Sequence, residues 1–166
     1  TELFPEPQAK LGKVAMLPGV DGRKMSKSYN NDIHLASTPE EIESKVRMMI
    51  TDPGRIKKTD PGNPEVCIVH TYHNIYNPSG VEDIRTACRA GQIGCVECKK
   101  RLAARLNELL DPIRDRRAYY DEHPELVDDI LRTGTQRARE IGAQTLDEVK
   151  QAMHINYFPR EAARLR

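Results

Sequence analysis

The loop LPGVDGRKMSKSYNN, residues 17–31, is the most informative stretch of this 166-residue chain. Lys24 and Lys27 are separated by Met25 and Ser26, among glycine, aspartate and asparagine residues that are typical of turns. Two flexible ammonium groups in one loop can neutralise the charge of a triphosphate, because lysine carries a compact charge on a mobile stem. From composition alone, an exposed basic loop without such a role is the more common explanation.

The residues around this loop predict one strand followed by helices. The apolar run LGKVAML at 11–17 predicts a buried strand, and a helix is expected to begin at Pro39 after a Ser-Thr pair that can cap it. A proline- and glycine-rich loop should cover 51–64, and further helices are expected at 65–76, 80–90, 95–120, 124–141 and 146–153. Pro112 should kink the longest of them. The expected fold class is mainly α.

Two of these helices carry apolar residues at helical spacing. In the helix that begins at Pro39 they are Ile42, Val46, Met49 and Ile50. In the longest helix they are Leu102, Leu106, Leu109, Leu110 and Ile113. These faces are the expected core.

The overall charge excludes little, since the formal net charge is +1. Charge is segregated locally, with a basic run from Lys99 to Arg117, an acidic stretch at 121–129 and further arginines beyond it. There is no apolar run long enough for a membrane helix and no signal-peptide pattern, so we expect a cytoplasmic protein. Because the sequence starts without methionine, we expect it to be part of a longer protein.

The four cysteines, Cys67, Cys88, Cys95 and Cys98, have the spacing C-x20-C-x6-C-x2-C. Thiols stay reduced in the cytosol, so this array favours a metal site over disulfides. Four thiolates suit zinc or an iron–sulfur cluster. Structural zinc sites usually have two Cys-x-x-Cys pairs, whereas this chain has one; ordinary buried thiols are the third alternative.

Residues 17–31 resemble the signature loop of class I aminoacyl-tRNA synthetases, most closely that of the bacterial tryptophanyl members. The similarity continues through 51–53, 60–67 and 71–73, and covers essentially the whole chain. The resemblance implies an enzyme that activates tryptophan with Mg-ATP and charges its tRNA. It implies a remnant of a Rossmann-type catalytic domain at 1–34, comprising its last strand and the signature loop. An α-helical anticodon-binding domain at 35–145 and a closing helix at 146–166, which packs back towards the catalytic domain, would follow.

The resemblance also implies roles for individual residues. Lys24 and Lys27 would contact the ATP phosphates, the segment Met25, Ser26 and Ser28 would complete that part of the ATP site, and the backbone of Val14 or Ala15 would meet adenine. The four cysteines would hold a [4Fe–4S] cluster, as some members of the family do on a nearly identical pattern. That cluster would support the RNA-binding surface rather than transfer electrons.

The implied partners are tRNA(Trp), tryptophan and ATP, with a homodimer formed through a catalytic domain outside this chain. The family's other signature and its amino-acid pocket are absent, so this chain alone should not aminoacylate tRNA. We expect tRNA contacts from six arginines: Arg114, Arg116, Arg117, Arg132, Arg137 and Arg139. Rival hypotheses are a stand-alone RNA-binding module with zinc or an iron–sulfur cluster, and a redox domain.

Other polar residues are weaker candidates. Four tyrosines could stack on bases, although core packing is the more common role for most of them: Tyr72, Tyr76, Tyr119 and Tyr120. Three histidines are more often surface or core residues than ligands: His34, His70 and His73.

Overall fold

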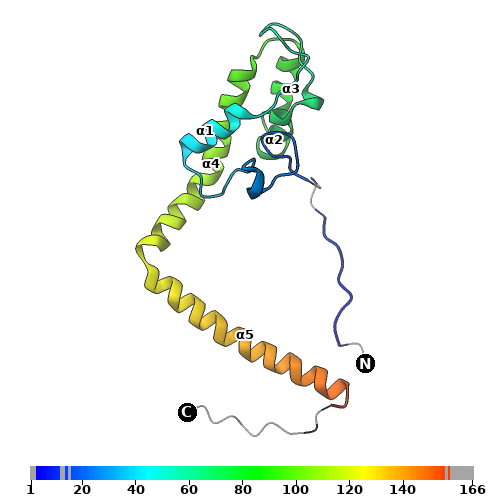
Figure 1. Ribbon diagram of the computed structural model, residues 1–166, viewed down its shortest axis with the longest axis vertical. Coiled ribbons are helices and arrows are strands. Elements are labelled where there is room, and N and C mark those ends of the chain that lie inside the picture. The colour runs from blue at the N-terminus through cyan, green and yellow to red at the C-terminus, as the bar shows by residue number, and fades with distance from the viewer. Residues whose placement is uncertain (1–2, 12–13, 15, 156, 158–166) are drawn as a thin grey trace. The chain divides into compact units, whose positions relative to one another are not determined.

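The computed structural model describes residues 3–11, 14, 16–155 and 157. Five α-helices follow one another along these residues (Figure 1): α1 Pro39–Met48, α2 Ile68–Tyr76, α3 Val81–Arg89, α4 Cys95–Glu122 and α5 Pro124–Ala152. Two short 3₁₀ helices, η1 Lys27–Tyr29 and η2 Pro64–Val66, complete the described elements. The mainly α fold class is confirmed. None of the helices in this part of the chain is both long and apolar enough to cross a membrane.

The predicted strand at 11–17 is wrong for the residues that can be described there. Leu11 is 89% exposed and Met16 is 60% exposed, so this run is not buried. The described residues contain no strand, and the nearest feature is an isolated antiparallel bridge between Pro18 and Lys24. A strand needs neighbours to accept and donate its backbone hydrogen bonds. The described residues offer none to this run.

The described chain divides into two compact units, residues 11–119 and residues 1–10 with 120–166. The larger unit has one apolar core: Val20, Ile42, Val46, Met49, Cys67, Val69, Tyr72, Leu102, Ala103, Leu106 and Leu110. Val20 comes from the lysine loop and packs in this core with α1, α2 and α4. The loop therefore shares its core with the helices, and the domain boundaries at residues 34 and 145 stay a prediction.

The predicted start of α1 at Pro39 is confirmed. The Thr38 hydroxyl accepts a hydrogen bond from the Glu41 amide, and the Glu41 carboxylate accepts one from the Thr38 amide, which forms a capping box. Ile42, Val46 and the C-cap residue Met49 are buried, as predicted. Ile50 is half exposed instead, since the helix has ended at Met48.

The predicted helix at 65–76 is interrupted at Cys67. The φ of Cys67 is −96° and its ψ is 119°, which is extended backbone. Cys67 therefore ends η2 and also serves as the N-cap residue of α2. This break lets the Cys67 side chain enter the core.

Helix α4 continues through Pro112 and buries Leu102, Leu106 and Leu110, while the predicted core residues Leu109 and Ile113 are exposed. Helix α5 is continuous, so the predicted break at 142–145 is wrong. The Gln144 amide donates to the Glu148 carboxylate, and the Thr145 hydroxyl donates to the Ile141 carbonyl. These two contacts connect successive turns across the expected break.

Candidate ATP-phosphate loop and cysteine group

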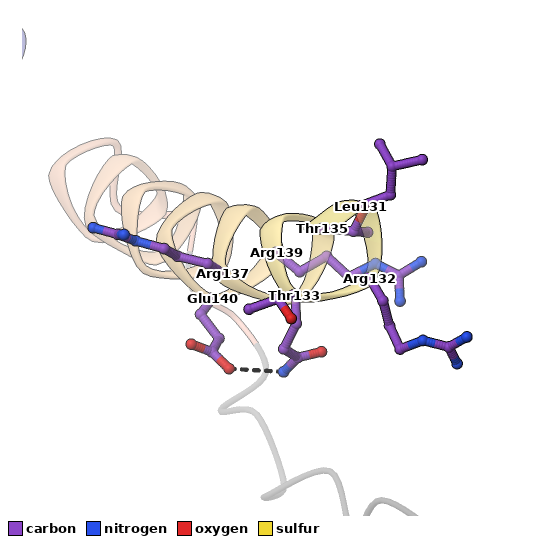
Figure 2. A pocket seen from close by; sticks show the side chains of 8 residues that line it. Leu131, Arg132, Thr133, Thr135, Arg137, Arg139 and Glu140 are labelled. Carbon is purple, nitrogen blue, oxygen red and sulfur yellow. Dashed lines mark hydrogen bonds between the residues drawn. The ribbon is translucent and has the colours of Figure 1, made fainter. Parts of the chain in front are cut away.

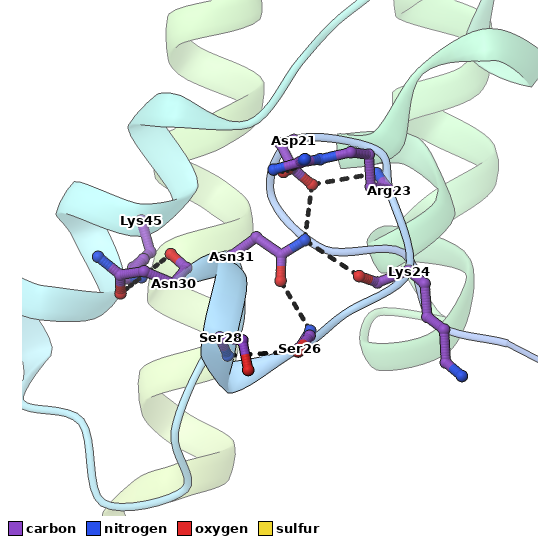
Figure 3. Close-up of polar contacts among 8 residues, drawn as sticks. All are labelled: Asp21, Arg23, Lys24, Ser26, Ser28, Asn30, Asn31 and Lys45. Atoms are coloured by element: carbon purple, nitrogen blue, oxygen red, sulfur yellow. Dashed lines mark hydrogen bonds and ion pairs between the residues drawn. The ribbon is translucent and has the colours of Figure 1, made fainter.

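Asn31 organises the lysine loop, although it is 1% exposed and carries no charge. Its Nδ2 group donates to the Asp21 carboxylate at 2.8 Å and to the Lys24 carbonyl at 3.1 Å (Figure 3). Its Oδ1 atom accepts from the Ser26 amide at 2.8 Å, and its own carbonyl accepts from the Val20 amide at 2.9 Å. One buried side chain therefore connects the two ends of the loop around the signature residues.

Two glycines make this arrangement possible. A Cβ atom at Gly19 would lie 2.4 Å from Asn31 Nδ2, so a larger residue would displace the amide. Gly22 has a φ of +81°, a left-handed conformation that suits glycine in the Asp21-Gly22 turn. Both glycines therefore serve the Asn31 network.

Asp21 is held as an anion in this network. The hydrogen bond from Asn31 lowers the pKa of the Asp21 carboxyl, and the hydrogen bonds and charge of Arg23 lower it further. The Arg23 guanidinium also lies 4.6 Å from the centre of the Tyr29 ring, in a cation–π contact. Arg23 is therefore committed to the loop's own structure.

The two signature lysines are exposed on this framework. The Ser26 hydroxyl caps η1 by accepting from the Ser28 amide at 3.3 Å, and Lys27 is the first residue of that short helix. Figure 3 shows the Lys24 side chain pointing away from the Asn31 network. A rigid backbone thus presents ammonium groups that its own hydrogen bonds do not use.

The loop is also anchored to the helices. Lys45 on α1 donates to the Asn30 carbonyl at 2.5 Å and to its Oδ1 atom at 2.7 Å. The Tyr72 hydroxyl on α2 donates to the Pro18 carbonyl at 2.6 Å. Burial raises the pKa of Tyr72, which keeps its hydroxyl protonated as a donor. Tyr72 is therefore a core residue, which is the more common role that the sequence analysis gave for the tyrosines.

The remaining loop predictions have different positions. Met25 packs against the core, Ser28 is exposed, and Val14 is 44% exposed. Ala15 lies outside the described residues. Asn31 and Tyr72 were missed as loop supports, since Asn30-Asn31 reads only as a turn signal and Tyr72 is 41 residues beyond Asn31.

The four cysteines come from two helices and the N-cap of a third, and all are reduced. Cys67 caps α2, Cys88 lies near the end of α3, and Cys95 and Cys98 lie in the first turn of α4. The backbone of Gly62 approaches so closely that a Cβ atom there would lie 2.6 Å from Cys88 Sγ. Gly91, with a φ of +68°, turns the chain back towards the loop at Thr59.

Arg55 is a member of this group that the sequence did not indicate. One nitrogen of its guanidinium lies 3.8 Å from Cys88 Sγ and 3.9 Å from Cys95 Sγ. The other terminal nitrogen donates to the carbonyls of Lys58 and Ile93 at 2.5 and 2.6 Å. Arg55 thus connects loop 51–63 to the cysteines through one planar, permanently charged group.

The sulfurs also influence one another electrostatically. Burial, together with the charges of the other three cysteines, raises the pKa of Cys98 to about 12. Burial likewise raises the pKa of Cys88, against the opposing charge of Arg55. Within the described residues, however, no three Cys, His, Asp or Glu side chains form a group that could hold a metal ion.

The three histidine candidates have core or surface positions. His73 is fully buried, with Nδ1 near Asn77 Nδ2 at 3.2 Å and Nε2 near the Cys98 carbonyl at 3.2 Å. His70 is also buried, and its Nδ1 lies 3.3 Å from Asn74 Nδ2. His34 is exposed beside Asp32. These positions agree with core and surface roles.

Three of the six arginines belong to the unit 11–119 and three to the unit that includes 120–166. The Arg114 side chain is 16% exposed and donates to the Ser37 carbonyl, the Asn107 side chain and the Asp111 carboxylate. Arg116 and Arg117 are exposed on α4, close to the end of the unit 11–119. Arg132, Arg137 and Arg139 project from α5, which has no buried residue. Figure 2 shows the Arg137 side chain directed away from Arg132 and Arg139, as their helical spacing requires.

With this loop and helical unit described, the chain can be compared with known proteins. A family profile described as tRNA synthetases class I (W and Y) matches residues 1–111. This chain belongs to that family, the class I tRNA synthetases for tryptophan and tyrosine.

Its individual relatives are tryptophan enzymes. The tryptophan–tRNA ligase of Thermotoga maritima is 45% identical over 158 residues, which are 94% of this chain and 48% of the relative. That of Aquifex aeolicus is 43% identical over 93% of this chain and 40% of the relative. The chain spans about half the length of the curated relatives that it matches.

Solved structures agree. The tryptophanyl-tRNA synthetase of Campylobacter jejuni, in a crystal structure with ADP and tryptophan, has a TM-score of 0.76 at 26% identity and covers 92% of this chain. This chain in turn covers 48% of that protein. The archaeal tryptophanyl-tRNA synthetase of Aeropyrum pernix has a TM-score of 0.56 at 35% identity over 60% of this chain.

Proposed function

We propose that this chain is part of a tryptophan–tRNA ligase, in which it supplies the ATP-phosphate loop and the helical tRNA-binding domain but not a complete active site. The observation that carries the proposal is the presentation of Lys24 and Lys27 on a loop held by the buried Asn31. The identity to tryptophan–tRNA ligases over nearly the whole chain supports tryptophan as the amino acid. A stand-alone RNA-binding module remains the alternative.

The loop lysines act on charge. As the tryptophan carboxylate attacks the α-phosphate of Mg-ATP, negative charge develops on the departing pyrophosphate. Lys24 and Lys27 stabilise that charge in the transition state more than in the ground state, which raises the rate of the step. Ser26, Met25 and Ser28 keep the two stems at fixed spacing, and Val14 belongs to the proposed adenine side of the site.

Charging of tRNA by the full-length protein that carries this chain tests the function. The protein should attach tryptophan to a tRNA(Trp) transcript and discriminate against tyrosine, in a reaction that requires ATP and Mg²⁺. The isolated 166-residue chain should be inactive while still binding the transcript. Equal charging with tyrosine would contradict tryptophan as the substrate, and no charging at all would favour the stand-alone module.

For tRNA contacts we retain Arg116, Arg117, Arg132, Arg137 and Arg139, because they are exposed. Arg114 is better explained as a structural residue. Reversal of charge at Arg116 and Arg117 should weaken tRNA binding and flatten its dependence on salt, since each lost phosphate contact lowers the slope by about 1. Reversals that leave both quantities unchanged would remove these two residues from the surface.

For the cysteine group we propose a [4Fe–4S] cluster, with zinc as the alternative. Four thiolates could serve either metal group. Among the described residues no group of three or more such side chains is arranged to hold a metal ion, so this observation favours neither alternative. Sulfurs that influence one another and share the Arg55 cation support a shared metal group. When bound, the cluster supplies rigidity to the helices that carry it.

Metal analysis of anaerobically purified protein tests this assignment. We expect about four irons per chain, as a [4Fe–4S] cluster requires, and a brown colour that is lost in Cys95→Ser. Stoichiometric zinc without iron, in protein made with iron available, would support the zinc alternative. If the protein contained neither iron nor zinc, the four cysteines would be ordinary buried thiols.

The remaining predictions concern the whole protein. We propose a cytoplasmic homodimer whose dimer contacts lie in the catalytic domain, with tRNA(Trp), tryptophan and ATP as its partners. Residues 146–166 would pack against that domain, although residues 156 and 158–166 lie outside the described part of the chain.

A further inference from the structure

A cavity of about 360 Å³ lies between α1 and α4, within the unit 11–119. Its apolar surface comes from Val46, Val96, Ala103 and Ala104. Val46 and Ala103 belong to the buried core, whereas Val96 is 70% exposed. The cavity is therefore a recess that opens from the surface of the unit onto its core. Neither the lysine loop nor the six arginines discussed above line it, whereas Cys95 of the cysteine group does.

Cationic side chains surround this apolar recess. Arg47 from α1 and Lys99 and Lys100 from α4 line it, against a single carboxylate, Glu43. Lys99 Nζ donates to the Arg47 carbonyl at 2.8 Å, which fixes that ammonium across the gap between the two helices. Lys100 makes no ion pair with any described residue. The recess therefore presents an excess of positive charge beside an apolar floor.

This combination selects a ligand with an anion joined to a flat apolar body. A free phosphate would not contact the apolar floor favourably, and an apolar ligand would not pair with the three cations. An unstacked nucleotide has both parts, since its base packs against apolar groups while its phosphate pairs with lysine and arginine. Proteins that recognise single-stranded RNA loops use bases splayed out in this way.

We propose that the α1–α4 cavity receives one unstacked nucleotide of the tRNA, with its base against Val96 and Ala104, above the buried Val46, and its phosphate near Arg47, Lys99 and Lys100. This inference rests on the proposed tRNA-binding function and adds a base-contact site to the arginines proposed for tRNA contact. The sequence did not single out Lys99 or Lys100, because basic residues on a long helix usually face solvent.

The test uses the full-length protein and two variants that act on different halves of the ligand. Ala104→Leu fills the apolar part with a residue that favours helix. Lys100→Ala removes one cation at an exposed position. Arg101→Ala is the matched control, because Arg101 is the next residue, carries the same charge and pairs with Glu97 outside the cavity. Thermal unfolding of each variant confirms that it folds.

Binding is measured with hairpins of the tRNA(Trp) anticodon arm, one intact and others with a single abasic nucleotide at each loop position. Wild-type protein should lose affinity roughly 5- to 150-fold at one position, the range for one stacked base. Ala104→Leu should weaken intact RNA by a similar factor and remove the penalty at that position. Lys100→Ala should lower the salt slope by about 1, while Arg101→Ala should match wild type.

Three results would overturn the inference: affinity for intact RNA unchanged in Ala104→Leu, an abasic penalty that persists in that variant, or equal effects of Lys100→Ala and Arg101→Ala. An affinity that is insensitive to every abasic position, yet falls in Lys100→Ala, would mean that the cavity binds phosphate only. Any of these outcomes together with normal tryptophan charging refutes the cavity alone. Loss of tryptophan charging by the wild-type protein refutes the proposed function instead.

Discussion

At the scale of single residues, Asn31 accounts for the shape of the lysine loop. Its amide is buried and makes hydrogen bonds at both ends, so it cannot be replaced by a residue that lacks either the donor or the acceptor. A buried amide that loses a partner leaves another polar group unsatisfied, at a cost of about 1–3 kcal/mol. The neighbouring Asn30 is exposed, and its side chain accepts one hydrogen bond, from Lys45. Two adjacent asparagines therefore have different structural importance.

The first prediction compares Asn31→Asp with Asn30→Asp. The change at Asn31 removes the donor to Asp21 and places two carboxylates side by side, so the free energy of unfolding should fall by about 1–3 kcal/mol. The change at Asn30 keeps an acceptor for Lys45, and aspartate tolerates the left-handed φ of 49° there. Chemical denaturation measures both variants. Equal stability of the two would contradict the role given to Asn31.

His70 gives the second prediction, on the pH dependence of stability. Burial lowers the pKa of His70, and the nearby charge of Arg85 lowers it further. The unfolded chain then binds more protons than the folded one between that lowered value and about 6.5, the ordinary value for histidine. Stability from this residue is present above about pH 6.5 and is lost as the pH falls through the folded pKa.

Unfolding of His70→Gln should accordingly depend less on pH between 7 and 5 than unfolding of wild type. His34→Gln is the control, because His34 is exposed and should leave the wild-type dependence in place. Parallel curves for wild type and His70→Gln would show that this histidine does not contribute.

At the scale of elements, Arg114 joins two helices. Its guanidinium donates to the Ser37 carbonyl, directly before the cap of α1, and to Asn107 and Asp111 on its own helix. Asn107 and Asp111 precede Pro112, where the helix lacks one backbone donor. Arg114 therefore supports α4 near that proline and fixes the start of α1 against it.

The third prediction follows from this contact. Arg114→Gln should lower the free energy of unfolding by about 1–3 kcal/mol, because it leaves the buried Ser37 carbonyl without its charged donor. Arg116 lies two residues further along the same helix and is exposed, so Arg116→Gln should change the free energy of unfolding by less than about 0.5 kcal/mol. The same pair should show the opposite order in tRNA affinity. If Arg114→Gln lost tRNA affinity but kept full stability, Arg114 would contact tRNA and would not be a structural residue.

These elements show what sequence patterns could and could not indicate. The Thr38-Pro39 start of α1 was predictable because capping is local. The break at Cys67 and the continuity of α5 through 142–145 were not, since they depend on contacts between side chains. Leu109 and Ile113 fit the apolar spacing of α4 but lie exposed, because a periodic pattern does not say where a packing partner ends.

At the scale of the whole molecule, the sequence indicated the lysine loop but not the contacts that hold it in place. The lysine loop stood out because its residue types are unusual together. Its supports, Asn31, Tyr72 and Lys45, come from separate parts of the chain and carry no local signal. Arg55 was hidden for the same reason among the basic residues of loop 51–63. Long-range contacts of this kind require coordinates.

The strand predicted at 11–17 belongs to the same scale. Its apolar pattern suits a buried position, but a strand forms only where a sheet accepts its hydrogen bonds. The described residues of this chain provide no such sheet, so Leu11 and Met16 are exposed. The contact of Val20 with the helical core depends on the same long-range packing.

The central claim, that Lys24 and Lys27 stabilise pyrophosphate as it leaves ATP, is tested most directly by ATP–pyrophosphate exchange in the full-length protein. We expect the exchange to depend on tryptophan. Lys27→Ala should slow it by a factor on the order of 10² or more, mainly in kcat, and should leave the affinity for tryptophan nearly unchanged. Lys57→Ala, in the exposed part of loop 51–63, is the control and should exchange at the wild-type rate. Wild-type exchange kinetics in Lys27→Ala would contradict the claim.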